Sequence, residues 1–140
     1  MPNWCENVVF IEHKSRKLIQ KLYIEFDDGN IIQKYLPIPE RLTEIQTNKW
    51  CNENWGTKFD IDSACVNIHT RSRIQVNFLS AWNPPNKFYK HLRSLGFTVH
   101  ALYCEPGSGF CGQDTADDDI VYDMSDAPEI IQRYFSEHFA

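Results

Sequence analysis

Apolar residues along the chain follow a two-residue spacing in some segments and a helical spacing in others. Residues 7–11 form a short run rich in β-branched side chains, and residues 97–103 alternate between apolar and polar positions. Residues 64–69 and 73–79 also alternate, and 70–72 between them are turn residues. Alternation and β-branched side chains favour strands. We therefore predict four strands, of which the second and third form a hairpin.

Two segments between these strands carry apolar residues at helical spacing. Ser15 is a good N-cap for a predicted helix over 15–26. Pro84 and Pro85 stand where the N-terminus of a second predicted helix, over 85–95, tolerates proline. The order β-α-β-β-α-β is the split βαβ plan of a ferredoxin-like sandwich, an α+β fold. The expected core is thus a four-stranded antiparallel sheet with two helices on one face.

On this plan the hairpin strands turn alternate side chains toward the helices. The residues expected to face the helices are Val66, Ile68, Ile74, Val76 and Phe78. The other face would carry mostly polar residues: Cys65, Asn67, His69, Arg73, Gln75, Asn77 and Leu79. RNA-recognition modules of the same plan stack bases on exposed aromatic residues of this face. A polar face without them counts against such binding and suits protein docking or cover by the chain's own tail.

The rest of the chain adds to this plan within one predicted domain over 1–140. Residues 28–62 are an expected insertion that contains tryptophan, and 113–140 are an expected C-terminal extension with an acidic loop and a helix. Three elements are expected in these additions: a short helix near 41–47, an edge strand at 120–122, and a terminal helix over 128–139.

Charge is unevenly distributed, although the net charge of −5 gives no general attraction to nucleic acid or anionic membrane. Residues 71–99 contain five basic residues and no acidic one, whereas 100–140 contain one basic residue and nine acidic ones. The chain has no apolar segment that predicts a signal peptide or a membrane span. Its five irregularly spaced cysteines suit reduced thiols. We therefore expect a cytoplasmic protein, in the host cytosol if it is phage-encoded, without membrane contact.

Four short clusters combine aromatic residues with glycine and proline. They are MPNWC at 1–5, NWGTK at 54–58, AWNPP at 81–85 and YCEPGSGFCG at 103–112. Together they resemble the YubB-like family of phage and plasmid proteins with a ferredoxin-like domain. One departure is Phe59, which stands where the family pattern has tryptophan. The resemblance implies the ferredoxin-like fold and a mobile-element origin; the family has no assigned activity.

The clusters are best explained as structural. Trp55 and Gly56 predict a loop sealed by a buried tryptophan, and Trp82 is expected to fill the corner beside Pro84 and Pro85. The third loop, 103–112, is a glycine-rich bend that carries Glu105 and Phe110. Loops of this kind on rigid elements often bind ligands.

Metal and catalytic patterns are weak. Cys104 and Cys111, with His100 nearby, lack the paired spacing of zinc sites, and the acidic run 114–126 lacks the glycine and glutamate of a calcium loop. No local arrangement marks a nucleophile. We therefore predict no cofactor, no metal and no enzymatic activity.

The resulting hypothesis is a mobile-element accessory protein that binds a host or phage protein and inhibits a host defence or another host process. Its partner-binding candidates are Asp117, Asp118, Asp119, Glu105 and Phe110. The alternative is a nucleic-acid-binding module that uses Arg71, Arg73, Lys87, Lys90 and Arg93. A second alternative is an enzyme with a small-ligand pocket at the Glu105 loop.

Overall fold

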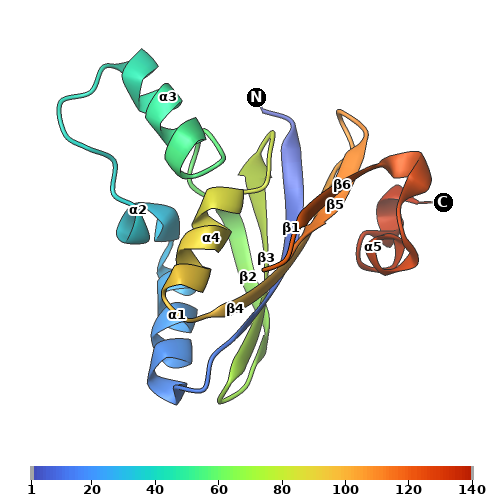
Figure 1. Cartoon of the computed structure of the whole chain (residues 1–140), viewed down its shortest axis with the longest axis horizontal. Coiled ribbons are helices and arrows are strands. Elements are labelled where there is room, and N and C mark those ends of the chain that lie inside the picture. The colour runs from blue at the N-terminus through green and yellow to red at the C-terminus, as the bar shows by residue number, and fades with distance from the viewer. Residues whose placement is uncertain (1, 140) are drawn as a thin grey trace.

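A computed structural model describes residues 2–139 and shows an α+β fold built on one antiparallel sheet (Figure 1). The strands are β1 (Trp4–Glu12), β2 (Asp62–His69), β3 (Arg73–Ala81), β4 (Thr98–Glu105), β5 (Phe110–Asp114) and β6 (Asp119–Asp123). Their order in the sheet is β2-β3-β1-β4-β5-β6. The predicted four-stranded sheet is therefore wrong, because the chain after β4 adds two more strands.

The two added strands arise because the glycine-rich bend is a tight hairpin. The Glu105 carboxylate accepts hydrogen bonds from the backbone N–H groups of Gly107 and Ser108 at 2.8 and 2.9 Å. Gly109 has a φ of +77°, which favours glycine. The chain then returns along β4, with Cys111 opposite Cys104, and turns again into β6. The expected edge strand at 120–122 is confirmed as part of β6.

All four predicted helices have a counterpart, although the one expected near 41–47 lies further along the chain at 44–54, and two further helical segments were not predicted. The α-helices are α1 (Arg16–Asp28), α2 (Ile31–Tyr35), α3 (Glu44–Asn54), α4 (Asn86–Ser94) and α5 (Glu129–Tyr134), with short 3-10 turns η1 (Met124–Asp126) and η2 (Ser136–His138). Ser15 caps α1 by accepting from Leu18 N, as the sequence predicts. The expected terminal helix is shorter than predicted and ends in η2. Within residues 2–139, none of the helices has the length and apolarity needed to cross a membrane.

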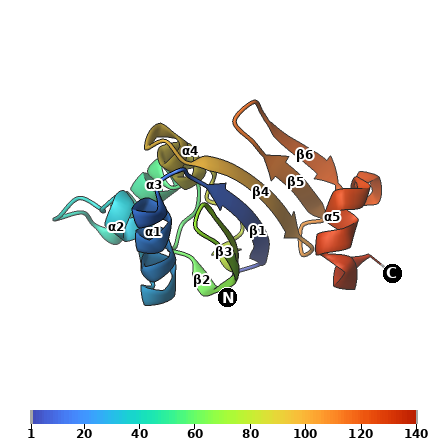
Figure 2. The same ribbon diagram turned by 90° about the horizontal axis from the view of Figure 1, so that it is seen from below.

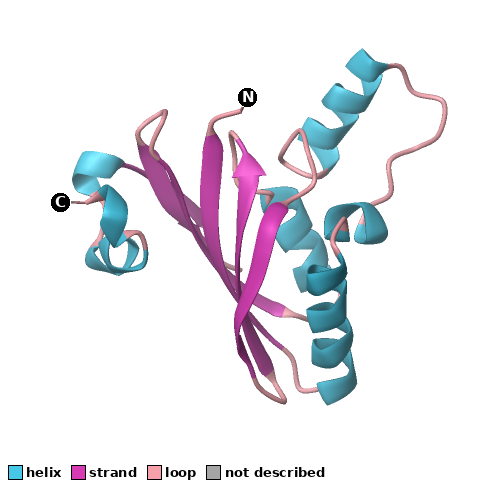
Figure 3. Ribbon diagram, turned by 180° about the vertical axis from the view of Figure 1, so that it is seen from behind, coloured by secondary structure: helices cyan, strands magenta, loops and turns pink. Residues whose placement is uncertain are grey.

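The sheet separates two apolar layers (Figures 2 and 3). Helices α1 to α4 lie on one face, and α5 lies on the other. The core on the α1–α4 face includes Ile19, Leu22, Phe26, Trp55, Ile74, Val76, Phe78, Phe88 and Leu92. The smaller core under α5 includes Val8, Leu102, Cys104, Cys111, Ile131 and Phe135. The C-terminal segment thus covers the outer face of β1, β4 and β5, leaves that of β3 half-buried and leaves that of β2 open.

A register shift in β2 changes which residues face the helices. Val66 lies opposite Val76, but Ile68 lies opposite Gln75 because the pairing shifts between Val66 and Ile68. An extra residue in a strand reverses the alternation that follows it. The prediction that Ile68 faces the helices is therefore wrong, since its side chain is exposed. His69, expected on the open face, instead stacks on Tyr23 of α1.

Candidate functional site

The four aromatic-glycine-proline clusters meet at one end of the sheet. The backbone N–H of Trp82 donates to the carbonyl of Asn3 at 2.8 Å. The Thr57 hydroxyl donates to the carbonyl of Ala81 at 2.9 Å. Gly107 lies so close to Asn3 that a Cβ atom there would be 2.9 Å from Asn3 Cγ. Segments far apart in the sequence therefore build one rim around the start of β1.

Buried polar side chains hold this rim together. The Asn7 amide donates to Ser80 Oγ at 2.9 Å and its carbonyl oxygen accepts from the Tyr89 hydroxyl at 2.8 Å. Ser80 Oγ in turn donates to the carbonyl of Asn83 at 2.6 Å. Buried polar groups are costly unless they are paired, and these are paired with one another. The network fixes the corner between β3 and α4 and leaves its own members no free atoms for a ligand.

The predicted burial of Trp55 is confirmed. Its side chain is 2% exposed, and its indole N–H donates to the carbonyl of Leu36 at 2.8 Å. Gly56 has a φ of +85°, and a Cβ atom there would lie 2.0 Å from Asn86 Oδ1. Pro84 and Pro85 are buried at the start of α4.

The predicted burial of Trp82 is wrong. Its side chain is 38% exposed, and its φ of +62° is unusual for a bulky residue. This backbone conformation turns the indole to the surface, where it lies beside the exposed ring of Phe59 at a centroid separation of 6.1 Å. Lys58 Nζ lies 5.4 Å from the Phe59 ring and 5.6 Å from the Trp82 ring. Two aromatic rings and one cation thus lie together at the rim.

Glu105 is not available for partner contact, contrary to the prediction. It is 1% exposed, and its two carboxylate oxygens accept the hydrogen bonds that form the β4–β5 turn. A hollow of about 380 Å³ lies beside this loop and is lined in part by Asn3, Trp4 and Gly107. Because the carboxylate is already used by the turn, it offers no acid or base for the enzyme alternative.

The two rival charged stretches of the sequence meet in one groove, which we call the α4–β6 groove. Its α4 wall carries Asn86, Lys87, Lys90 and Arg93, and its other wall is the turn from Asp114 to Asp119; the volume is about 370 Å³. A smaller hollow of about 160 Å³ shares Asn86 and Asp119 with it and is lined by Tyr103, Phe110 and Val121. Phe110 is half-buried there against the Tyr103 ring.

An ion pair closes the floor of the α4–β6 groove. Arg93 Nη1 donates to Asp114 Oδ1 at 2.7 Å, and both side chains are largely buried. Burial raises the pKa of Asp114, while the Arg93 guanidinium opposes that rise. Nearby, the Tyr103 hydroxyl donates to Asp119 Oδ1 at 2.7 Å, and burial together with this carboxylate raises the pKa of the tyrosine. Arg93 is therefore a structural cation, and it is not free to bind phosphate.

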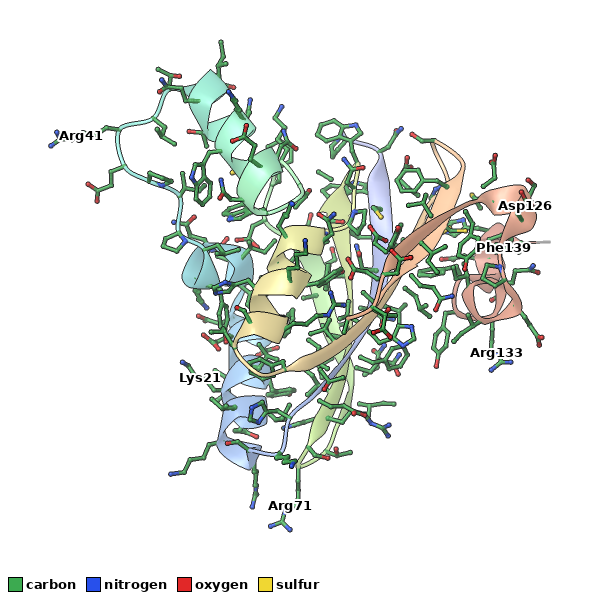
Figure 4. The ribbon with its side chains drawn as sticks, viewed as in Figure 1. Lys21, Arg41, Arg71, Asp126, Arg133 and Phe139 are labelled. Carbon is green, nitrogen blue, oxygen red and sulfur yellow. The ribbon has the colours of Figure 1, made fainter. Side chains whose placement is uncertain are left out.

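The basic stretch does not form one continuous surface. Arg71 lies at the tip of the β2–β3 turn, far from α4 (Figure 4). Arg73 lies 3.8 Å from the carboxylate of Glu12. Lys87 and Lys90 are exposed on α4, but they share the groove with the acidic turn. A phosphate backbone that followed α4 would meet these carboxylates, which weakens the nucleic-acid alternative.

Strand β6 is a free, regular edge of the sheet. Within the described residues it pairs only with β5, through five consecutive residue pairs without a register shift. Ile120 and Val121 are exposed, at 44% and 60%. The predicted partner-binding residues Asp117 and Asp118 are exposed on the turn that precedes the strand, and Asp119 is exposed at its first position. Asp123 is exposed at its end.

One further group of side chains was missed by the sequence analysis. Glu6 on β1 lies beside Glu137 and His138 of η2. The 130 residues that separate Glu6 from Glu137 hide this group from any spacing rule. It forms only because the C-terminal segment folds back over the outer face of the sheet.

Comparison with known proteins gives little further guidance. No family model matches the chain, and no curated protein matches it. Among solved structures, it is similar to the crystal structure of a protein api92 from Yersinia pseudotuberculosis, described under the family model DUF1281. The TM-score is 0.48 and the identity 15%, over 66% of this chain. The match spans 35% of the other chain, so this chain corresponds to about a third of it.

Proposed function

We propose that this chain is a non-enzymatic binding protein and that its partner is a protein that docks on the β6 edge. The observation that carries the proposal is the free strand itself, which combines unpaired backbone groups with the exposed side chains of Ile120 and Val121. An edge strand of this kind is a template for a strand of another chain, which adds main-chain hydrogen bonds. Docking by strand addition would satisfy the free backbone groups of β6.

The opposite edge of the sheet supports this choice by contrast. Strand β2 is also an edge, but its pairing with β3 is shifted at two places, between Asp62 and Cys65 and between Val66 and Ile68. Irregular edges resist pairing with another strand. The β2 edge is therefore irregular and a poor template for strand addition, whereas the β6 edge is regular.

Charge selects the kind of partner. Asp117 and Asp118 precede the edge strand, Asp119 begins it and Asp123 ends it, and all four are exposed. A basic segment would be drawn to this edge, because complementary charge mainly accelerates association. The partner is therefore proposed to present a basic, extended segment.

The cellular role follows from the resemblance of the four clusters to the YubB-like family. We propose an accessory protein of a phage or another mobile element that inhibits a host defence or another host process. Five free cysteines, four of them buried, support a reducing cytoplasm. We also propose that β1–β4, α1 and α4 are a ferredoxin-like unit extended by β5 and β6, which the order β2-β3-β1-β4 supports.

The test is a capture experiment from bacterial lysate with three forms of the tagged chain. Val121→Lys places a charge on the edge strand, and Ile45→Lys makes the same change at an exposed position of α3. We expect one protein to be captured by the wild type and by Ile45→Lys but not by Val121→Lys. Equal capture by all three forms would contradict the proposal, provided that Val121→Lys keeps the melting temperature of the wild type.

The same experiment distinguishes the nucleic-acid alternative. Nucleic acid recovered with the chain and lost steeply as salt rises would indicate phosphate contacts. Lys87→Gln together with Lys90→Gln would then reduce the recovery, whereas Val121→Lys would not. That result would replace the protein partner with a nucleic acid.

A further inference from the structure

Three side chains that can ligate metal meet where the C-terminus crosses the sheet. Glu6, Glu137 and His138 each place one ligand atom within 4.8 Å of the others. His138 Nε2 contacts Glu6 Oε2 directly and lies 3.6 Å from Glu137 Oε1. The His138 imidazole thus lies against two carboxylates. Even when protonated, it carries a single positive charge against two negative ones.

The group differs from ordinary exposed acidic clusters. The side chains of Glu6 and His138 are only 28% and 26% exposed, whereas that of Glu137 is 73% exposed. Glu6 points to the outer face of the sheet, the face that bears Val8 and Leu102 of the core under α5. Two of the three ligands are therefore held by packing, and the third can move to complete the set.

An orphaned oxygen lies in the adjoining groove. A groove of about 350 Å³ between the C-terminal segment and β3 is lined in part by Glu6, Glu137 and Asn77. Asn77 Oδ1 is the one buried side-chain nitrogen or oxygen in residues 2–139 without a hydrogen-bond partner. Glu6 and Asn77 are diagonal neighbours on the outer face, since Glu6 pairs with Leu79 and Val8 with Asn77. A buried acceptor without a donor indicates a missing partner, such as a water molecule held by a cation.

The group can also be reached from solvent. Glu6 and His138 line the hollow of about 380 Å³ beside Asn3 and Trp4. A credible metal site needs suitable ligands, plausible separations and a path of entry. The first and the third of these conditions are met here.

We propose that Glu6, Glu137 and His138 bind a divalent transition-metal ion of the zinc class. Zinc binds histidine nitrogen and carboxylate oxygen at about 2.0–2.2 Å, so tetrahedral ligand atoms lie about 3.4 Å apart. The 3.6 Å between His138 Nε2 and Glu137 Oε1 fits this separation, whereas the direct contact between His138 Nε2 and Glu6 Oε2 has to open by a turn of the Glu6 carboxylate to admit the ion. An imidazole in the set favours zinc over magnesium or calcium, which prefer oxygen ligands alone. Three protein ligands leave the fourth position for water.

Such an ion would tie the two ends of the chain together, because β1 begins at Trp4 and η2 ends at His138. It would therefore raise the melting temperature of the full chain. This effect does not depend on the partner proposed for β6.

The test is a calorimetric titration of Zn²⁺ into the full chain after treatment with EDTA. Cys65 is an exposed thiol and would compete for zinc, so every form carries Cys65→Ser. We expect one ion per chain, with micromolar or tighter affinity. Glu137→Gln should weaken binding at least tenfold and His138→Gln should abolish it, while Mg²⁺ should bind far more weakly.

Glu129→Gln is the matched control, because Glu129 is an exposed glutamate on α5 outside the group. It should bind Zn²⁺ like the parent chain. Glu137→Gln should keep the metal-free melting temperature, since its side chain is mostly exposed, but should lose the rise that zinc produces. No saturable binding to the parent chain, or equal affinity in Glu137→Gln and Glu129→Gln, would overturn the proposal.

Discussion

Trp55 and Trp82 occur in similar clusters of aromatic residues with glycine or proline, yet Trp55 is buried and Trp82 is exposed. Trp55 is enclosed by the α1–α4 core and donates its indole N–H to a backbone carbonyl. Trp82 has a positive φ and lies half-exposed beside Phe59. The sequence predicts both as buried, because residue type alone does not reveal the backbone conformation that turns Trp82 outward.

Substitution should separate the two roles. Trp55→Ala leaves a large cavity and should lower the free energy of unfolding by about 3–5 kcal/mol. Trp82→Gly loses contacts with Phe59 but relieves a left-handed backbone that costs about 1–2 kcal/mol in other residues, so stability should change by about 1 kcal/mol or less. Urea titration of both variants measures this. Equal losses of unfolding free energy in the two variants would contradict the assignment of Trp55 to the core and Trp82 to the surface.

The buried thiols make a second prediction at the scale of single residues. Cys5, Cys51, Cys104 and Cys111 are buried, and burial raises the pKa of each, that of Cys104 to about 12. In the native chain at pH 8, a thiol reagent should therefore modify Cys65 rapidly and the other four only as the chain opens. Rapid modification of more than one thiol per chain would be inconsistent with this burial.

The same shifts predict the response to alkali. Thiols of the unfolded chain lose their protons near pH 9, whereas those of the folded chain keep theirs to a higher pH. The unfolded state then binds fewer protons, so stability is fully present below pH 9 and falls as the pH rises above it. Urea midpoints at pH 8 and pH 10.5 test this: the midpoint should be lower at pH 10.5, and an unchanged midpoint would count against the burial of these groups.

At the scale of elements, β5 is where sequence and structure differ most, since the edge strand expected at 120–122 is present in β6. Residues 110–114 contain glycine and no β-branched residue, so they carry little strand signal. They become a strand because the Glu105 turn returns the chain along β4. The helices at 15–26 and 85–95 were predictable because Ser15, the prolines and the apolar spacing act locally. The bulge at Ile68 was not, because it is set by pairing with β3.

Substitution of Gly112 on β5 tests how tightly β6 packs against its neighbouring strand. A Cβ atom there would lie 2.3 Å from the Tyr103 hydroxyl and 2.5 Å from the carbonyl oxygen of Ile120. The second contact is backbone, so β6 would have to shift. Gly112→Ala should therefore destabilise the chain by about 1–3 kcal/mol, with Gln113→Ala on the same strand as the control. Thermal unfolding checks this, and equal melting temperatures for the two variants would show that β6 can adapt.

At the scale of the whole molecule, the fold joins features that the sequence keeps apart. The basic stretch and the acidic stretch meet in the α4–β6 groove, although they were predicted as alternative surfaces. The exposure of Asp117 to Asp119 was predictable, because consecutive carboxylates resist burial. The group of Glu6, Glu137 and His138 was not predictable, because it depends on the C-terminal segment crossing the sheet.

The exposed acidic turn yields a prediction about kinetics. Replacing Asp117, Asp118 and Asp119 together with Asn should change stability by about 1 kcal/mol or less, as is usual for surface sites; the amide oxygen of the Asn that replaces Asp119 can still accept from the Tyr103 hydroxyl. Association with the captured partner should slow most at low salt, because steering by charge is screened by ions. Stopped-flow mixing at two salt concentrations measures it. Unchanged association rates would leave the turn without a role in binding.

The most direct test of the account is hydrogen exchange of the β6 amides in the presence of the captured partner. If a strand of the partner adds to this edge, the backbone N–H groups of residues 119–123 that point away from β5 should become protected from exchange. Those of β2 at the opposite edge should keep their exchange rates. Protection confined to other segments, with β6 exchanging as in the free chain, would contradict docking at this edge.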